Sequence, residues 1–299
     1  MDPIVFINRK TNTKVEEKPP GAGFLNFLYS NPFGKLTLQL LFKRKVVSAV
    51  GGWYMNSKKS ASRVKIFITN HQMEMNDYKV PEAGFKTFNE FFYRKIKKEA
   101  RPIGDHLICP ADGKVLVFDN IEASKQFFVK GAQFDLKTFL GSHSLAEKYK
   151  GGGMVIIRLA PTDYHRYHFP FEGFAGESIA IDGDYLSVSP LALRKSLDIF
   201  LKNKREYMSL KTKDYGDILI CDVGATMVGT IIQTYQAGAL VEKGQEKGYF
   251  AFGGSTLVML TEKNRASFSK DLLENSKNGF ETEVFHDFSF EASKLRIQW

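Results

Sequence analysis

Hydrophobic positions divide the chain into a first third with helical spacing and a longer remainder with short, strand-like runs. Residues 1–20 are predicted to form a polar lead-in. Apolar side chains then recur densely over residues 24–50, around a basic cluster at residues 43–45. This spacing predicts a short basic helix with a broad apolar face, which ends at the glycine pair of residues 51 and 52.

A clearer helix is predicted to start after Thr87. The run Thr87-Phe88-Asn89-Glu90 has the form of a capping box, in which the threonine hydroxyl accepts from a backbone N–H group and the glutamate reaches back. Large apolar side chains then line one face of the predicted helix, at positions 85, 88, 91, 92 and 96. Lysines at positions 95, 97 and 98 would suit the negative C-terminal end of its dipole.

After residue 102 the pattern changes to short β-branched or aromatic runs bounded by glycine, aspartate or proline. These runs predict strands at residues 115–118, 154–159, 218–223, 227–232 and 249–260, interrupted by one helix that starts near residue 189. We therefore expect an α+β fold. A helical region over residues 1–103 would precede an antiparallel β sandwich or barrel-like catalytic domain over residues 104–299.

Composition and charge narrow the range of partners. The chain has 299 residues, is 43% hydrophobic and carries a formal net charge of +9. Residues 1–100 hold 18 Lys or Arg and 8 Asp or Glu, a net charge of +10, so the remainder sums to −1. A basic end of this kind attracts anionic lipid or nucleic acid. Because no nucleic-acid motif is present, we expect no nucleic-acid partner.

The basic helical stretch has two interpretations from the residues alone. It packs on the protein's own core with a solvated basic side, or it lies on a lipid surface. No apolar run approaches about 18 residues and the N-terminus lacks signal-peptide features, so any membrane contact is expected to be peripheral. Cys109 and Cys221 have neither disulfide nor zinc spacing, which favours a cytosol-facing protein.

Three short segments carry side chains suited to catalysis. Asp112 lies in a Pro-Ala-Asp-Gly turn, His165 and His168 lie three residues apart between prolines, and Ser255 follows two glycines. Each has a structural alternative: a turn aspartate, structural or surface histidines, and a glycine bulge in a strand. The histidines could share a helix face and bind metal, but no further ligand has a plausible spacing, and we expect no metal.

Together the three segments supply a nucleophile, a base and a carboxylate that orients the base. One use of this set is self-cleavage. Ser255 Oγ can attack the carbonyl of Gly254, because a glycine there leaves the approach unobstructed and allows an unusual backbone conformation. The order Asp, His, Ser also suits a serine hydrolase, although the Gly-x-Ser-x-Gly elbow is absent.

The ordered motifs resemble those of the phosphatidylserine decarboxylase proenzymes. The resemblance covers nearly the whole chain and rests on residues 85–94, 100–103, 110–113, 163–168, 201–205, 223–229, 243–248 and 254–256. Each motif is weak alone, whereas the ordered set is highly specific. Much of the family has leucine where Gly253 stands here, but the scissile Gly-Ser pair is intact.

The resemblance implies a self-processing triad of Asp112, His168 and Ser255, with cleavage between Gly254 and Ser255. The products would be a long chain, residues 1–254, and a short chain, residues 255–299, in which Ser255 has become a pyruvoyl cofactor. This cofactor would decarboxylate phosphatidylserine to phosphatidylethanolamine and CO2 through a Schiff base. The same resemblance assigns His165 to the decarboxylation step, as proton donor.

The resemblance also implies partners and a location. The enzyme would meet phosphatidylserine at an anionic membrane, with residues 24–50 at the interface, as a peripheral protein on the cytoplasmic face of the cell membrane. It would form a homodimer of processed units. The alternatives are a pyruvoyl-dependent decarboxylase of a soluble amino acid, a non-cleaving serine hydrolase, and a β-barrel binding module in which Ser255 never reacts.

Overall fold

The computed structural model describes residues 4–17, 23, 31, 45–123, 135–184, 201–224, 231–253, 255–286 and 290, with only the backbone of residues 45–49 and 123. Its strands are β1 (Ile4–Asn8), β2 (Thr13–Glu17), β3 (Gly113–Phe118), β4 (Met154–Leu159), β5 (Arg166–His168), β6 (Gly173–Ala175), β7 (Ile179–Ile181), β8 (Arg205–Lys211), β9 (Asp217–Gly224), β10 (Ile231–Gln233), β11 (Leu240–Val241), β12 (Glu246–Phe250), β13 (Ser255–Thr261) and β14 (Glu281–Val284).

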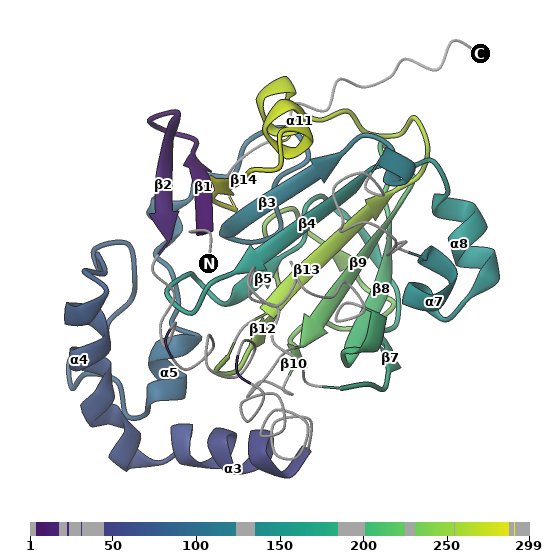
Figure 1. Cartoon of the computed structure of the whole chain (residues 1–299). Helices are drawn as coiled ribbons and strands as arrows, with labels where there is room; N and C mark the ends of the chain where they lie inside the picture. The colour runs from purple at the N-terminus through teal and green to yellow at the C-terminus, as the bar shows by residue number, and fades with distance from the viewer. Residues whose placement is uncertain are drawn as a thin grey trace.

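The helices of the described residues lie mostly at the two ends of the molecule. They are α3 (Lys45–Met55), α4 (Ser62–Asn70), α5 (Phe88–Phe92), α7 (Leu136–Leu140), α8 (His143–Tyr149) and α11 (Lys270–Lys277), with single 3-10 turns at Lys58–Ala61, Lys98–Ala100 and Ile121–Ala123. Figure 1 shows α3, α4 and α5 together at one end, away from α11. Among the described residues, no helix combines the length and hydropathy needed to cross a bilayer.

Two sheets form the body of the protein (Figure 1). The main sheet has eleven strands in the order β11-β6-β8-β9-β13-β4-β3-β14-β1-β2, with β7 also paired to β8. A second sheet has the order β10-β12-β5. All pairs are antiparallel except β1 with β14. The predicted mixture of helices with a mostly antiparallel sheet is confirmed.

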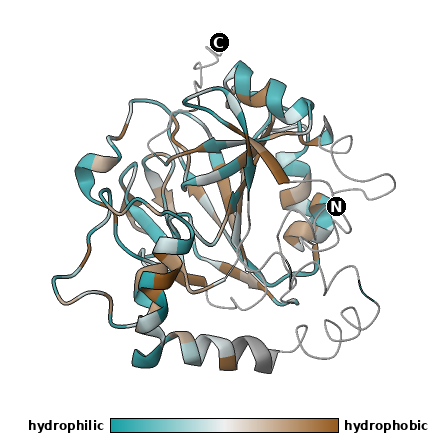
Figure 2. Cartoon of the chain, turned by 60° about the vertical axis from the view of Figure 1, so that its left-hand side comes forward, coloured by the Kyte–Doolittle hydropathy of each residue, from teal (hydrophilic) through white to brown (hydrophobic). Residues whose placement is uncertain are grey.

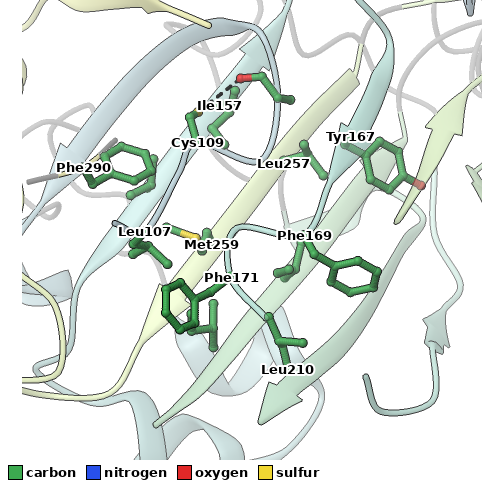
Figure 3. Packing of buried hydrophobic residues seen from close by; sticks show 14 of the residues in the cluster. Leu107, Cys109, Ile157, Tyr167, Phe169, Phe171, Leu210, Leu257, Met259 and Phe290 are labelled. Carbon is green, nitrogen blue, oxygen red and sulfur yellow. Dashed lines mark hydrogen bonds between the residues drawn. The ribbon is translucent and has the colours of Figure 1, made fainter. Parts of the chain in front are cut away.

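The middle of the main sheet is buried on both faces. Every residue of β3, β4 and β13 is buried, and Figure 2 shows hydrophobic residues along the strands. One face packs against the small sheet through Tyr167 and Phe250, in the cluster of Figure 3. The other face packs against α7 and α8 through Phe139 and Tyr149. Continuous apolar runs are typical of strands covered on both sides. The prediction of a sandwich is therefore correct only in that two sheets of unequal size pack together.

The prediction of a polar lead-in over residues 1–20 is wrong for residues 4–17. These residues form β1 and β2, an antiparallel pair that joins the main sheet beside β14. Ile4 and Phe6 are buried, and Glu17 forms an ion pair with Arg158 of β4. The division at residues 103 and 104 therefore does not separate helices from the sheet, although it remains a prediction as a domain boundary.

The predicted helix after Thr87 exists but is short. Its capping box is half confirmed: the Thr87 hydroxyl accepts from the Glu90 N–H at 3.0 Å, whereas the Glu90 carboxylate accepts from Lys86 instead of reaching back to Thr87. The apolar face is buried at Phe88, Phe91 and Phe92. The helix ends at Phe92, so the prediction that the following lysines lie at its C-terminal end is wrong.

Two further boundaries differ from the sequence-based prediction. The run 249–260 is not one strand, because β12 ends in the small sheet at Phe250 and β13 begins in the main sheet at Ser255. Helix α3 continues through Gly51 and Gly52 to Met55. The helix predicted near residue 189, and residues 24–44 of the basic stretch apart from Asn31, lie outside the described residues.

Candidate functional site

Ser255 begins the central strand β13. It pairs with Leu159 of β4 on one side and with Gly224 of β9 on the other. Its side chain is fully buried, and its Oγ has no hydrogen-bond partner within the described part of the chain. Gly253 has φ of 141°, a conformation that favours glycine. Gly254, the other half of the predicted cleavage site, lies outside the described residues.

The register of the main sheet places Asp112 at the same edge as Ser255. Arg158 of β4 pairs with Lys114 of β3 on one side and with Thr256 of β13 on the other. Strands β3 and β13 are both antiparallel to β4, so they run in the same direction about 10 Å apart, at twice the usual strand spacing. Asp112 precedes Lys114 by two residues, and Ser255 precedes Thr256 by one.

His165 presents an unused ring nitrogen in the interior. Its Nδ1 lies 3.0 Å from the Asp163 carbonyl oxygen. Since a carbonyl only accepts, Nδ1 carries the proton and Nε2 keeps its lone pair. Nε2 is buried without a partner among the residues described. Burial, followed by the charge of Arg94, lowers the pKa of His165 to about 3, against a weaker opposing effect of the Asp163 and Gly253 backbone.

The loop that carries His165 is held from two sides. The buried Arg94 donates to the carbonyls of Thr162 and Asp163 at 2.9 and 3.2 Å. From β3, the Lys114 ammonium donates to the Asp163 carboxylate at 2.8 Å. Charged donors make stronger hydrogen bonds than neutral ones. Arg94 and Lys114 therefore fix the loop, and with it the position of His165.

Helix α5 packs against both His165 and the segment before Ser255. The ring centroid of Phe92 lies 3.8 Å from that of His165. Phe252 makes edge contacts with Phe88 and Phe92, with centroids 5.2 Å apart in each case. These contacts place the helical segment of the first hundred residues directly on the candidate site.

The tautomer of His168 is fixed by a backbone carbonyl and not by a carboxylate. Its Nδ1 lies 2.9 Å from the Gly244 carbonyl oxygen, so Nδ1 is the donor. Its Nε2 accepts from the Tyr164 hydroxyl at 3.2 Å. Burial raises the pKa of Tyr164, which keeps this hydroxyl protonated. Burial, followed by the neighbouring His286, lowers the pKa of His168 to about 3, so the ring is neutral.

Asp112 is bound to groups other than His168. One carboxylate oxygen accepts from Arg101 at 3.0 Å, and the other accepts from the side chain and backbone of His286. Burial raises the pKa of Asp112, but His286 and then Arg101 outweigh it and bring the pKa to about 2. Asp112 and Ser255 thus lie at the same edge of the main sheet, whereas His168 belongs to β5 of the small sheet and stacks on His286. No hydrogen bond joins these three side chains in the described residues.

Sequence reasoning missed two of these neighbours. His286 lies in a tail with no clear pattern, and nothing in the sequence connects it to Asp112. Tyr164 lies within the histidine motif, but no feature of the sequence indicates that its hydroxyl donates to His168. His165 and His168 make separate contacts, and no group of metal-binding side chains exists among the described residues.

Comparisons with known proteins agree on one family. The sequence model of the family described as phosphatidylserine decarboxylase matches residues 88–282. A protein of Fusobacterium nucleatum named phosphatidylserine decarboxylase proenzyme is 46% identical over 97% of this chain and 98% of its own length. Proteins of the same name from Clostridium tetani and Clostridium novyi are 46% and 44% identical, each over 94% of this chain and 95% and 96% of their own lengths.

Proposed function

Because the chain belongs to the phosphatidylserine decarboxylase family, we propose that it cleaves itself between Gly254 and Ser255 and then decarboxylates phosphatidylserine to phosphatidylethanolamine. The proenzyme name of its relatives supports the self-cleavage. The observation that carries the proposal is the state of Ser255: a buried hydroxyl without a hydrogen-bond partner among the described residues, directly after two glycines in the sequence. Burying a polar group without a hydrogen-bond partner costs free energy, and a catalytic role is one explanation for such a group in a native protein.

Self-processing converts one peptide bond into an ester. Ser255 Oγ gives its proton to His168 and bonds to the Gly254 carbonyl carbon. The C–N bond breaks as His168 returns the proton to the nitrogen of residue 255. Elimination across Cα and Cβ of residue 255 releases residues 1–254 with a terminal carboxylate. Water then converts the remaining dehydroalanine to ammonia and a pyruvoyl group.

Two features of the site suit this step. His168 is neutral and its Nε2 carries the lone pair, so it can act as a base once the Tyr164 hydroxyl releases it. Asp112 is ionised, since its pKa of about 2 lies far below neutral pH, and it supplies negative charge for the imidazolium that forms.

The fit of a pyruvoyl group at residue 255 is supported by the buried, unpartnered Oγ that it would replace. The pyruvoyl carbonyl supplies an electron acceptor for the carbon that loses CO2. His165 is neutral and has a free lone pair, so it first takes a proton from the substrate ammonium. It then returns that proton to the carbon from which CO2 has left, in keeping with its predicted role as donor.

The two chains are expected to stay together after cleavage. Strand β13, which starts the short chain, pairs with β9 over Ser255 to Thr261 and with β4 over Ser255 to Leu260. Its apolar side chains lie in both core clusters, on the two faces of the sheet. Separation would expose this whole strand, so we expect the long and short chains to remain together as one unit. A homodimer of such units remains a prediction.

A lipid substrate is supported by the surface around α3 and α4. Three large apolar side chains are exposed there: Trp53 of α3, Ile66 of α4 and Val80, which follows α4, are 74, 60 and 52% exposed. Exposed basic side chains accompany them, at Lys58, Lys59, Arg63 and Lys65. We call this set the α3–α4 surface. Apolar and basic side chains together favour a peripheral contact with anionic lipid, on the cytoplasmic face.

Two adjacent hollows lie beside this surface, and Val80 and Phe85 line both of them. One of about 350 Å³ is mostly apolar and includes Val64, Ile68 and Phe85. The other, of about 330 Å³, shares Phe85 and includes Lys79, Lys95, Arg94 and Arg166. The apolar hollow suits an acyl chain, and the exposed Lys79 and Lys95 suit the phosphate.

The substrate is tested by comparing phosphatidylserine in mixed micelles with free serine. We expect CO2 release from the lipid, loss of activity on treatment with borohydride, and little release from free serine. Equal rates on free serine would instead favour the soluble amino-acid decarboxylase. Labelling of an uncut chain at Ser255 by a fluorophosphonate would favour the hydrolase, which the complete burial of Ser255 argues against.

A further inference from the structure

His286 contacts two members of the predicted triad, Asp112 and His168. It follows β14 by two residues, and its side chain is buried. Its ring stacks on that of His168, with centroids 4.5 Å apart and planes only 10° apart. Tyr164 stacks beside both rings, with centroids 5.8 Å from each.

The other contacts of His286 go to Asp112. Its backbone N–H donates to Asp112 Oδ1 at 2.7 Å, and its Nδ1 lies 3.0 Å from the same oxygen. Since an ionised carboxylate only accepts, Nδ1 of His286 carries a proton. The second carboxylate oxygen is held by Arg101 at 3.0 Å. Asp112 is therefore fixed by His286 and Arg101.

In this arrangement Asp112 is not hydrogen-bonded to His168, because both ring nitrogens of His168 have other partners. Its Nδ1 already donates to the Gly244 carbonyl, and its Nε2 accepts from Tyr164. The carboxylate therefore acts on His168 through space, from a position that His286 sets. Because the backbone N–H and Nδ1 of His286 both approach the same Asp112 oxygen, the carboxylate is held beside the His168 ring on which His286 stacks.

We propose that His286 is a positioning residue for self-processing, which holds Asp112 at the distance from which it stabilises the His168 imidazolium. This inference rests on the proposed self-cleavage. It goes beyond the triad because His286 belongs to the predicted short chain, whereas Asp112 and His168 belong to the long chain. The imidazolium forms only while Ser255 is attacking, so His286 affects the cleavage and not the later decarboxylation at His165.

The test measures the cleavage half-time of newly translated precursor on denaturing gels. His286→Gln keeps a side-chain donor for Asp112, and His286→Phe keeps a stacking ring without a donor. The exposed His106→Phe serves as the matched control. We expect the Gln variant and the control to cleave at close to the wild-type rate. The Phe variant should cleave at least about tenfold more slowly, since one pKa unit of lost imidazolium stabilisation is a factor of ten.

Two further measurements separate positioning from a purely structural role. Decarboxylation per processed molecule should be unchanged in the Phe variant. Added imidazole should speed cleavage of His286→Gly. This second variant still tests the inference if the Phe variant does not fold. Wild-type cleavage rate in the Phe variant, equal slowing by Phe and Gln, or no imidazole rescue would overturn the inference. Failure of the wild type itself to cleave would overturn the proposed function instead.

Discussion

The backbone N–H of Phe252 donates a 2.7 Å hydrogen bond to the side-chain oxygen of Asn89 in α5. The Asn89 side chain is buried and in turn donates to Asn56 at 2.8 Å. A helix from the first hundred residues thus holds the chain three residues before Ser255. The segment between β12 and β13, which leads to Ser255, is therefore held by a helix outside both sheets.

Substitution of Asn89 by alanine should slow self-cleavage and lower stability. The change leaves a partly buried N–H group of Phe252 without its partner, which costs about 1–3 kcal/mol. The half-time of cleavage and the melting temperature measure the two effects. Asn56→Ala removes only the support of Asn89 and should have a smaller effect on both. An Asn89→Ala precursor that cleaves at the wild-type rate would contradict this role.

The two histidines should separate the two reactions. His168→Gln should remain uncleaved, because its base is lost. His165→Gln should cleave but lose decarboxylation by at least about a hundredfold, a usual size for a lost acid-base group. Gels and CO2 release measure the two steps, with His106→Gln as control. The opposite pattern, cleavage in the His168 variant and none in the His165 variant, would exchange the assigned roles.

Stability should fall as the pH falls below about 6.5. His165 and His168 have pKa values of about 3 in the folded chain, against 6.5 for an ordinary histidine. Between these values the unfolded chain binds protons that the folded chain excludes, so each histidine lowers the unfolding free energy by about 1.4 kcal/mol per pH unit. Asp112 adds a similar loss only below its ordinary pKa of 3.8.

Denaturant unfolding of the Ser255→Ala precursor at several pH values below 6.5 measures this slope on a single chain. His165→Gln in the same background should reduce the slope by about 1.4 kcal/mol per pH unit. The same slope with and without His165 would mean that the residue is not held neutral by burial.

The α3–α4 surface should bind anionic vesicles. Trp53→Ser and Ile66→Ser each remove a large exposed apolar side chain, and each should weaken binding about tenfold in a flotation assay with phosphatidylglycerol vesicles. Leu240→Ser is the control, because Leu240 is 67% exposed on β11. Equal losses in all three variants would argue against a specific membrane contact at α3 and α4.

Local pattern predicted the parts of the fold that depend on local burial. The run 154–159 matches β4 because all six residues are buried, and this leaves an unbroken apolar signal. Residues 4–17 were misread because their pairing with β14 joins the two ends of the chain. The prediction of one strand over residues 249–260 is wrong because the hydrophobic pattern does not show that the chain passes from the small sheet to the main sheet there.

The same distinction applies to the site. Asp112, His165, His168 and Ser255 could be proposed because motifs carry them. The partners of Asp112 could not, since His286 lies 174 residues away and meets it only through the pairing of β14 with β3. Which nitrogen of each histidine carries a proton also depended on the carbonyls of Asp163 and Gly244, which no side-chain pattern records.

Intact mass under denaturing and native conditions tests the central proposal most directly. For the wild type we expect two denatured chains, residues 1–254 and a pyruvoyl-started 255–299, which remain together in the native state because β13 is held between β4 and β9. The Ser255→Ala variant should give one chain near 33.9 kDa. Active wild-type protein that consists of a single uncut chain with an unmodified serine at position 255 would contradict the account.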